Sequence, residues 1–151
     1  MSDTGRPTSL SDLPAQIGPY LILEFIGQGQ TGAVVRARQT QEGQGGDENT
    51  DVAIKLVHPE LARDESFRQQ VLDEIDRAQR LQHPAIAAVK EVLSEGPWLG
   101  AVMEWVEGVS LTEYMVAEGL PTERVIELLR PLCAAIDEMH QVGIIHGGIH
   151  P

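Results

Sequence analysis

Length, composition and charge exclude several classes of function before any motif is considered. The chain has 151 residues, enough for one domain with a hydrophobic core, and its 23 acidic and 11 basic residues give a formal net charge of -12. This charge argues against nucleic acid or an anionic membrane surface as a partner, because no basic patch is available. No apolar run reaches the length of a membrane span and no signal-peptide pattern opens the chain, so we expect a cytoplasmic protein. Cys133, the single cysteine, lies in an apolar helical pattern and is expected to fill the core.

The first predicted structure is a β-hairpin. Residues 1–17 are rich in Ser, Thr, Pro, Asp and Gly, and we predict that they form a disordered leader. A β-rich run from Tyr20 to Ile26 then enters a glycine-rich turn. After the turn the residues alternate, with Arg36 and Arg38 on one face of an extended chain and apolar residues on the other. This pattern predicts a second strand and not a helix.

The turn between these strands has the sequence of a phosphate-binding loop. Its glycines let the backbone adopt conformations closed to other residues and bring N–H groups close to an anion, as phosphate-binding loops require. The same spacing occurs in dinucleotide-binding folds, but those place a helix after the last glycine. We therefore predict a hairpin turn that folds over phosphate groups, built from Ile26, Gly27, Gln28, Gly29, Gln30, Thr31, Gly32, Ala33 and Val34.

A third strand over residues 52–57 and a helix over residues 66–82 follow. Lys55 projects among apolar neighbours of the strand, which favours a phosphate contact over a lysine whose stem merely covers apolar surface. A capping box of Ser66 and Gln69 is expected to begin the helix. Glu74 lies beside its apolar stripe, and Lys55 is its candidate partner. The alternative is a boundary glutamate exposed to solvent.

The remaining chain predicts two more strands, over residues 87–94 and 98–103, and then helices. Residues 105–108 are a candidate connector between two lobes. Ser110 and Glu113 form a predicted capping box for a short helix, and Thr122 is expected to cap a longer one that Gly143 ends. The longer helix has a broad apolar face made of Val125, Leu128, Leu129, Leu132, Ile136 and Met139.

From about residue 19 onward, this ordered set of motifs resembles the eukaryotic-type serine/threonine protein kinases, particularly their bacterial branch. The resemblance implies an α+β fold, with a five-stranded antiparallel N-lobe sheet and αC helix at 18–104, a hinge at 105–108 and the first C-lobe helices at 109–151. It implies ATP as ligand, held by residues 26–34, Ala53 and Lys55, with Glu74 as the αC glutamate that pairs with Lys55. Met103 matches the gatekeeper position, and Glu104 to Val106 match the hinge that bonds adenine.

The resemblance departs from the family at the catalytic loop. His146, Gly147 and Gly148 stand where the family has His-Arg-Asp, so the carboxylate that accepts the substrate proton is replaced by Gly148. His150 replaces the family's lysine. The family also uses magnesium, but its ligands would follow residue 151, so we assign no metal ligand in these residues. We therefore expect a kinase-family segment that binds ATP, is catalytically impaired like a pseudokinase, and meets a protein partner or the rest of a C-lobe.

Two hypotheses besides that of a protein kinase stay open. Residues 146–151 are similar to the His-Gly-Asp-x-His-Pro loop of small-molecule phosphotransferases related to choline and aminoglycoside kinases, again without the Asp. The third hypothesis is an interaction module that keeps the kinase shape but binds no nucleotide.

Overall fold

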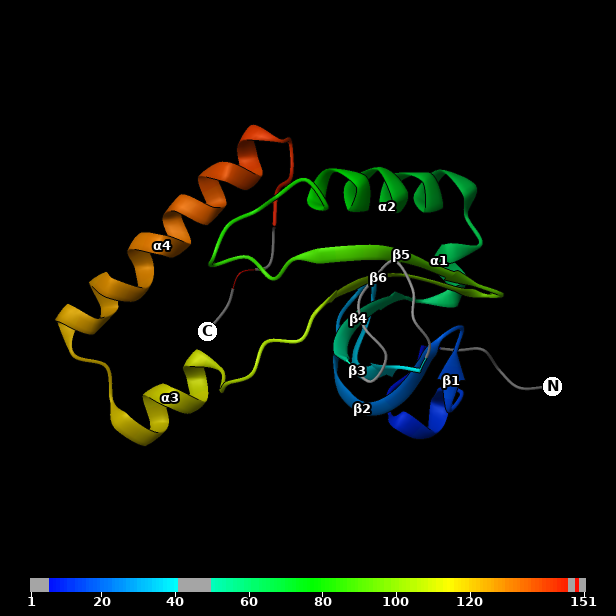
Figure 1. Ribbon diagram of the computed structural model, residues 1–151, viewed down its shortest axis with the longest axis horizontal. Coiled ribbons are helices and arrows are strands. Elements are labelled where there is room, and N and C mark those ends of the chain that lie inside the picture. The colour runs from blue at the N-terminus through cyan, green and yellow to red at the C-terminus, as the bar shows by residue number, and fades with distance from the viewer. Residues whose placement is uncertain (1–5, 41–49, 147–148, 150–151) are drawn as a thin grey trace.

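The computed structural model describes residues 6–40, 50–146 and 149. The start of the predicted leader, the predicted loop at 41–49, and Gly147, Gly148, His150 and Pro151 lie outside these residues. The described residues form the expected α+β fold, with a curled antiparallel sheet followed by two helices that stand beside it (Figure 1). No helix in the described ranges combines the length and the apolar character needed to cross a membrane.

The sheet is antiparallel throughout, and its strands lie in the order β1-β2-β3-β4-β6-β5. Their bounds are Gln16–Ile17 for β1, Tyr20–Gln28 for β2, Gly32–Gln39 for β3, Asp51–Val57 for β4, Val89–Glu95 for β5 and Trp98–Glu104 for β6. The five longer strands confirm the predicted strands to within a few residues at each end. The glycine-rich turn joins β2 to β3, as the alternating pattern predicted.

The prediction of a disordered leader is wrong for residues 6–17. A short 3-10 helix spans Leu10–Asp12, and β1 pairs with β2 through Gln16 and Ile17. The sheet thus has a sixth strand that the sequence did not predict. The side chains of Leu13 and Ile17 are buried in the main core, so this segment gains its order from the sheet and not from a periodicity of its own.

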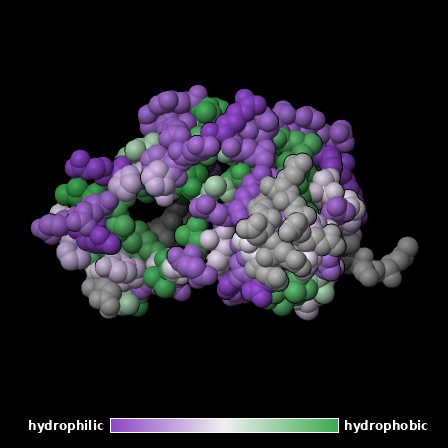
Figure 2. Space-filling model, in the orientation of Figure 1, coloured by the Kyte–Doolittle hydropathy of each residue, from purple (hydrophilic) through white to green (hydrophobic). Residues whose placement is uncertain are grey.

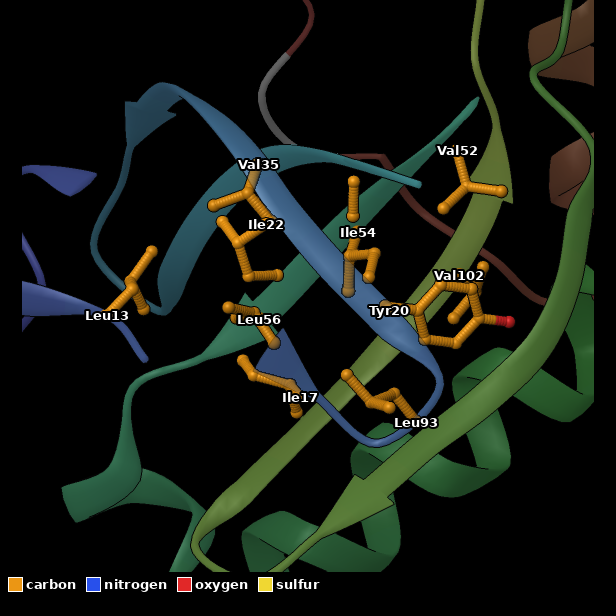
Figure 3. Packing of buried hydrophobic residues seen from close by; sticks show 11 residues of the cluster. Leu13, Ile17, Tyr20, Ile22, Val35, Val52, Ile54, Leu56, Leu93 and Val102 are labelled. Carbon is orange, nitrogen blue, oxygen red and sulfur yellow. The ribbon is translucent and has the colours of Figure 1, made fainter. Parts of the chain in front are cut away.

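The main core lies on the inner face of the curled sheet (Figure 3). Val52, Ile54 and Leu56 of β4 all point into it, which confirms the predicted alternation. Tyr20 is completely buried there and donates a hydrogen bond from its hydroxyl to Glu91 on β5. Burial, followed by this hydrogen bond, raises the pKa of the Tyr20 hydroxyl.

The opposite face of the sheet carries a second cluster, formed with the helices α1 (Pro59–Ala62) and α2 (Glu65–Ala78). Half-buried apolar residues of α2 pack against the buried Val57 and Leu99, and α2 runs above β5 in Figure 1. The predicted capping box at Ser66 is not the cap that forms. Asp64 caps α2 instead, because its carboxylate accepts the Phe67 N–H at 2.8 Å.

The two C-terminal helices are α3 (Leu111–Glu118) and α4 (Thr122–Gln141). The capping box of Ser110 and Glu113 is confirmed, whereas Pro121 and not Thr122 occupies the N-cap of α4. Cys133 is exposed on α4, so the prediction that it fills the core is wrong. The apolar residues of α4 gain little cover, since Ala135 is the one buried residue among those described in this helix.

Candidate functional site

The glycine-rich turn closes tightly and exposes its tip. The Gly29 N–H donates to the Gly32 carbonyl at 2.8 Å, and residues 28–31 are exposed to solvent. None of the three glycines of the turn has a positive φ, so the expectation of backbone conformations closed to other residues is wrong here. A Cβ added at Gly27 or Gly29 would meet nothing within 4 Å. These two positions therefore leave open space against the backbone, which a bulky anion can approach.

Gly32 serves a different purpose. A Cβ at this position would lie 1.9 Å from the Leu56 carbonyl oxygen, so glycine is required for β3 and β4 to approach each other. Ala33 is buried beside it, and Ile26, the first residue of the predicted turn, is about half exposed. Packing between strands, and not ligand contact alone, explains the last glycine of the motif.

The other predicted site residues of the sheet share one face. Val34 lies directly opposite Lys55 in the register of β3 and β4, and Ala53 lies opposite Met103 in the register of β4 and β6. Directly opposed residues point to the same side of a sheet. Val34, Ala53, Lys55 and Met103 thus lie together on the face that α2 covers, opposite the main core.

A cavity of about 290 Å³ opens between this face and α2. It brings together five of the predicted site residues, namely Thr31, Gly32, Lys55, Glu74 and Met103. The remaining predicted residues do not line it; those at the tip of the turn, residues 28–30, face solvent, and Val106 follows the end of β6. The apolar wall of the cavity was not predicted as part of the site; it is formed by Phe67, Val71, Ile75, Ala78, Val89 and Ala101. Only the helical periodicity of residues 67–78 signalled part of that wall.

The predicted ion pair between Lys55 and Glu74 does not form. None of the ion pairs between described residues joins them, and both residues are exposed although they line the same cavity. Ile75 supplies the buried contact of α2, which leaves Glu74 at the edge of the packed stripe. An exposed lysine and glutamate gain little from pairing, because water solvates each charge well.

The hinge segment begins where β6 ends. Glu104 is the last residue of β6, and its N–H donates to the Ala88 carbonyl at 2.9 Å. Val106 is 62% exposed, and its backbone takes part in no backbone hydrogen bond within the described ranges. Its N–H and carbonyl are therefore available to a ligand.

A charged cluster that the sequence analysis did not foresee holds the hinge against the sheet. The Arg36 guanidinium lies 4.6 Å from the centre of the Trp105 ring and donates to the Asp51 carboxylate at 2.9 Å. Trp105 in turn donates to Glu107 at 2.8 Å. Hydrogen bonds from Arg38 and then Arg36 lower the pKa of Asp51. The alternation of β3 placed Arg36 on the correct face, but it gave no sign of the contact with Trp105.

A second cavity, of about 450 Å³, lies between the sheet and α4. His146, from the predicted catalytic loop, lines it together with Leu132, Ile136 and Met139 of α4. Glu74 and Met103 line both cavities, so the two spaces adjoin at these residues. Figure 2 shows a hollow between the helical part and the sheet, with hydrophobic residues beside it. Within the described ranges, no group of three or more His, Cys, Asp or Glu side chains is arranged to hold a metal ion.

Comparisons with known proteins identify the family of the chain. A family model for the protein kinase domain matches residues 20–151. The chain belongs to the protein kinase family. This match favours the protein kinase hypothesis over that of a small-molecule phosphotransferase. Among its relatives, the chain is 36% identical over 150 residues to serine/threonine-protein kinase PknB of Mycobacterium tuberculosis, and the match covers 96% of this chain and 22% of that protein. It is 34% identical over 138 residues to PkaA of Streptomyces coelicolor, covering 87% of this chain and 25% of that protein.

Solved kinase structures share the fold. The crystal structure of the PknI kinase domain of Mycobacterium tuberculosis matches with a TM-score of 0.69 and 25% identity, over 92% of this chain and 56% of that one. Rad53, crystallised in complex with AMP-PNP, matches with a TM-score of 0.69 and 26% identity, over 87% of this chain and 33% of that one. The chain thus spans about a fifth of the length of PknB and about half of the PknI domain.

Proposed function

We propose that this kinase-family chain binds ATP through its glycine-rich turn and Lys55, and that it transfers phosphate poorly. One observation carries the proposal: Lys55 lines a single cavity with Thr31 and Gly32 of the turn and with Glu74 of α2. The only two lysines of the chain are Lys55 and Lys90, so few other ammonium groups could serve. The complex of the related Rad53 with AMP-PNP supports a nucleotide as the ligand.

The residues of the site fit a nucleotide in three ways. The open space at Gly27 and Gly29 lets phosphate oxygens approach the backbone of the turn closely. Lys55 supplies a compact positive charge to those oxygens. Val106 offers an unpaired N–H and carbonyl, which suit the hydrogen-bonding edge of adenine. When bound, ATP would supply the transferable phosphoryl group, and these residues would hold and orient it.

The impaired transfer follows from the identity of the catalytic-loop residues. Phosphoryl transfer depends on positioning and electrostatic stabilisation, and the family uses an aspartate to orient the substrate hydroxyl and accept its proton. Gly148 has no carboxylate, and His150 has a shorter and less permanently charged side chain than lysine. We therefore expect a nucleotide-binding protein whose role in signalling depends on binding more than on turnover.

Titration calorimetry with ATP, with and without magnesium, tests the binding. Lys55→Ala should weaken ATP binding about tenfold or more, since a hydrogen bond to a charged group contributes about 1.5–3 kcal/mol. Lys90→Ala is the matched control, because Lys90 lies on β5 and does not line the cavity. Its affinity should equal that of the wild type. An absence of heat and of thermal shift at millimolar nucleotide would instead favour the scaffold hypothesis.

A phosphotransfer assay tests the impairment separately. With magnesium-ATP and a generic protein substrate, the wild type should give no turnover above that of Lys55→Met. Robust turnover that Lys55→Met abolishes would refute the pseudokinase hypothesis while leaving ATP binding in place.

A further inference from the structure

His58, just after β4, connects the sheet to the glycine-rich turn. Its side chain is completely buried, and its Nε2 lies 3.0 Å from the Gly29 carbonyl oxygen. Its backbone N–H also donates to the Thr31 carbonyl at 3.0 Å. One residue therefore contacts the turn at two carbonyl groups, one through its side chain and one through its backbone.

The tautomer of His58 follows from this contact. Since a carbonyl oxygen only accepts hydrogen bonds, Nε2 must carry the proton, and in the neutral ring Nδ1 is then an acceptor. Nδ1 is buried and has no hydrogen-bond partner within the described ranges. A buried acceptor without a partner is unfavourable, and an apolar side chain of similar size would avoid that cost. The unpaired Nδ1 therefore lowers the stability of the fold, and the one side-chain hydrogen bond that the ring makes is to the glycine-rich turn.

We propose that His58 is a positioning residue that holds the glycine-rich turn in the conformation that receives phosphate. This inference rests on the proposed ATP binding. In a trans peptide the carbonyl and the next N–H point in opposite directions. The bond from His58 to the Gly29 carbonyl therefore turns the Gln30 N–H away from His58. Gln30 is exposed, and its N–H takes part in no backbone hydrogen bond within the described ranges, so it is free to meet an anion.

His58 also fixes the distance between the turn and the cation. Lys55 and His58 are three residues apart on the same segment, at the end of β4. A turn held by His58 keeps its place relative to the Lys55 ammonium. Without the side-chain contact, residues 29–31 would be held only by backbone hydrogen bonds, those from the Gly29 N–H to Gly32 and from the His58 N–H to Thr31.

Two variants separate positioning from folding. His58→Leu removes the donor and fills the same buried space, whereas His58→Gln keeps an amide donor near the position of Nε2. Amide hydrogen exchange is measured first, without nucleotide, over the peptide of residues 27–35. His58→Leu should raise exchange about three- to tenfold, the range expected for losing one hydrogen bond, and His58→Gln should restore it in large part.

Calorimetry then measures the affinities for ATP and for adenosine. His58→Leu should weaken ATP about three- to tenfold and leave adenosine unchanged, because only ATP has phosphates for the turn to hold. A purely structural residue would change both ligands alike. If His58→Leu does not fold, His58→Met replaces it as an apolar variant with a more adaptable side chain.

Each outcome decides a separate point. Unchanged hydrogen exchange in the apolar variant would overturn the contact between His58 and the turn. Increased exchange with an unchanged ratio of ATP to adenosine affinity would overturn the role in phosphate binding. If the wild type itself binds no ATP, the proposed function fails and the positioning role fails with it, while the exchange result still reports whether the turn is held.

Discussion

Gly32→Ala is the substitution for which the structure predicts the clearest separation of packing from binding. The added Cβ would lie 1.9 Å from the Leu56 carbonyl oxygen and 2.9 Å from its carbonyl carbon. Both neighbours are backbone atoms of a paired strand, so no side chain can rotate to relieve the contact. The strands β3 and β4 would have to move apart at this point, which weakens the sheet beside Lys55.

The expected cost is that of overpacking a well-packed region, about 1–3 kcal/mol in the free energy of unfolding. Because the clash is severe and involves the backbone, we expect a value in the upper half of this range. For a chain of this size each kcal/mol lowers the melting temperature by about 2–4 °C. Gly32→Ala should therefore melt about 4–12 °C below the wild type in differential scanning calorimetry.

Gly29→Ala is the matched control. It adds the same methyl group to the same turn, but a Cβ there meets nothing within 4 Å and the residue has no positive φ. Its free energy of unfolding should stay within about 0.5 kcal/mol of the wild type. Its affinity for ATP should nevertheless fall, since the methyl group occupies space that the phosphates need.

A third variant checks the packing argument away from the turn. Gly100→Ala would place a Cβ 2.5 Å from the Lys55 carbonyl oxygen, so it should also lower the melting temperature. If Gly29→Ala and Gly32→Ala melt at the same temperature, the claim that the close approach of β3 and β4 requires glycine at position 32 is refuted.

Three further predictions concern the charged cluster and α4. The pKa of Asp51 is lowered chiefly by Arg38, so its contribution to stability is complete above the unfolded pKa of 3.8 and is lost as the pH falls through the lower folded pKa. The stability of Asp51→Asn, measured by urea unfolding, should therefore approach that of the wild type as the pH falls from 6 to 2; a constant difference would contradict this assignment. Cys133 is exposed, so it should react with a thiol reagent in the native protein nearly as fast as in urea, and a strongly protected thiol would contradict its placement. Ile126 and Leu129 are about half exposed on α4, so the chain alone should bind a hydrophobic dye. Changing both residues to Gln should reduce that fluorescence, whereas a wild type that binds no dye would show that this face is covered.

The sequence was most informative where structure depends on near neighbours along the chain. The alternation after the glycine-rich turn predicted β3, and the faces of β4 were assigned correctly from Val52 to Val57. The spacing of apolar residues predicted α2, and the Ser110 and Glu113 pattern predicted the cap of α3. These features are repeats or contacts within a few residues, so the local pattern contains the information that forms them.

The same local logic misjudged features that depend on which surfaces meet. Residues 1–17 have no apolar periodicity that would predict structure, but the sheet buries Leu13 and Ile17. Cys133 lies in an apolar pattern, yet nothing in the described ranges covers its side of α4. Glu74 was correctly placed on the side of α2 toward Lys55, but the exposure that leaves the two unpaired depends on how α2 packs against the sheet.

The sequence alone therefore determined the family and the strand and helix pattern, because motif order and periodicity are properties of the chain itself. Tertiary structure decided why Gly32 must be glycine and how the turn is held. The approach of Leu56 to Gly32, and of the His58 ring to the Gly29 carbonyl, joins residues that are 24 and 29 positions apart. Contacts at such separations arise only when the strands pair, and no local pattern encodes their distances.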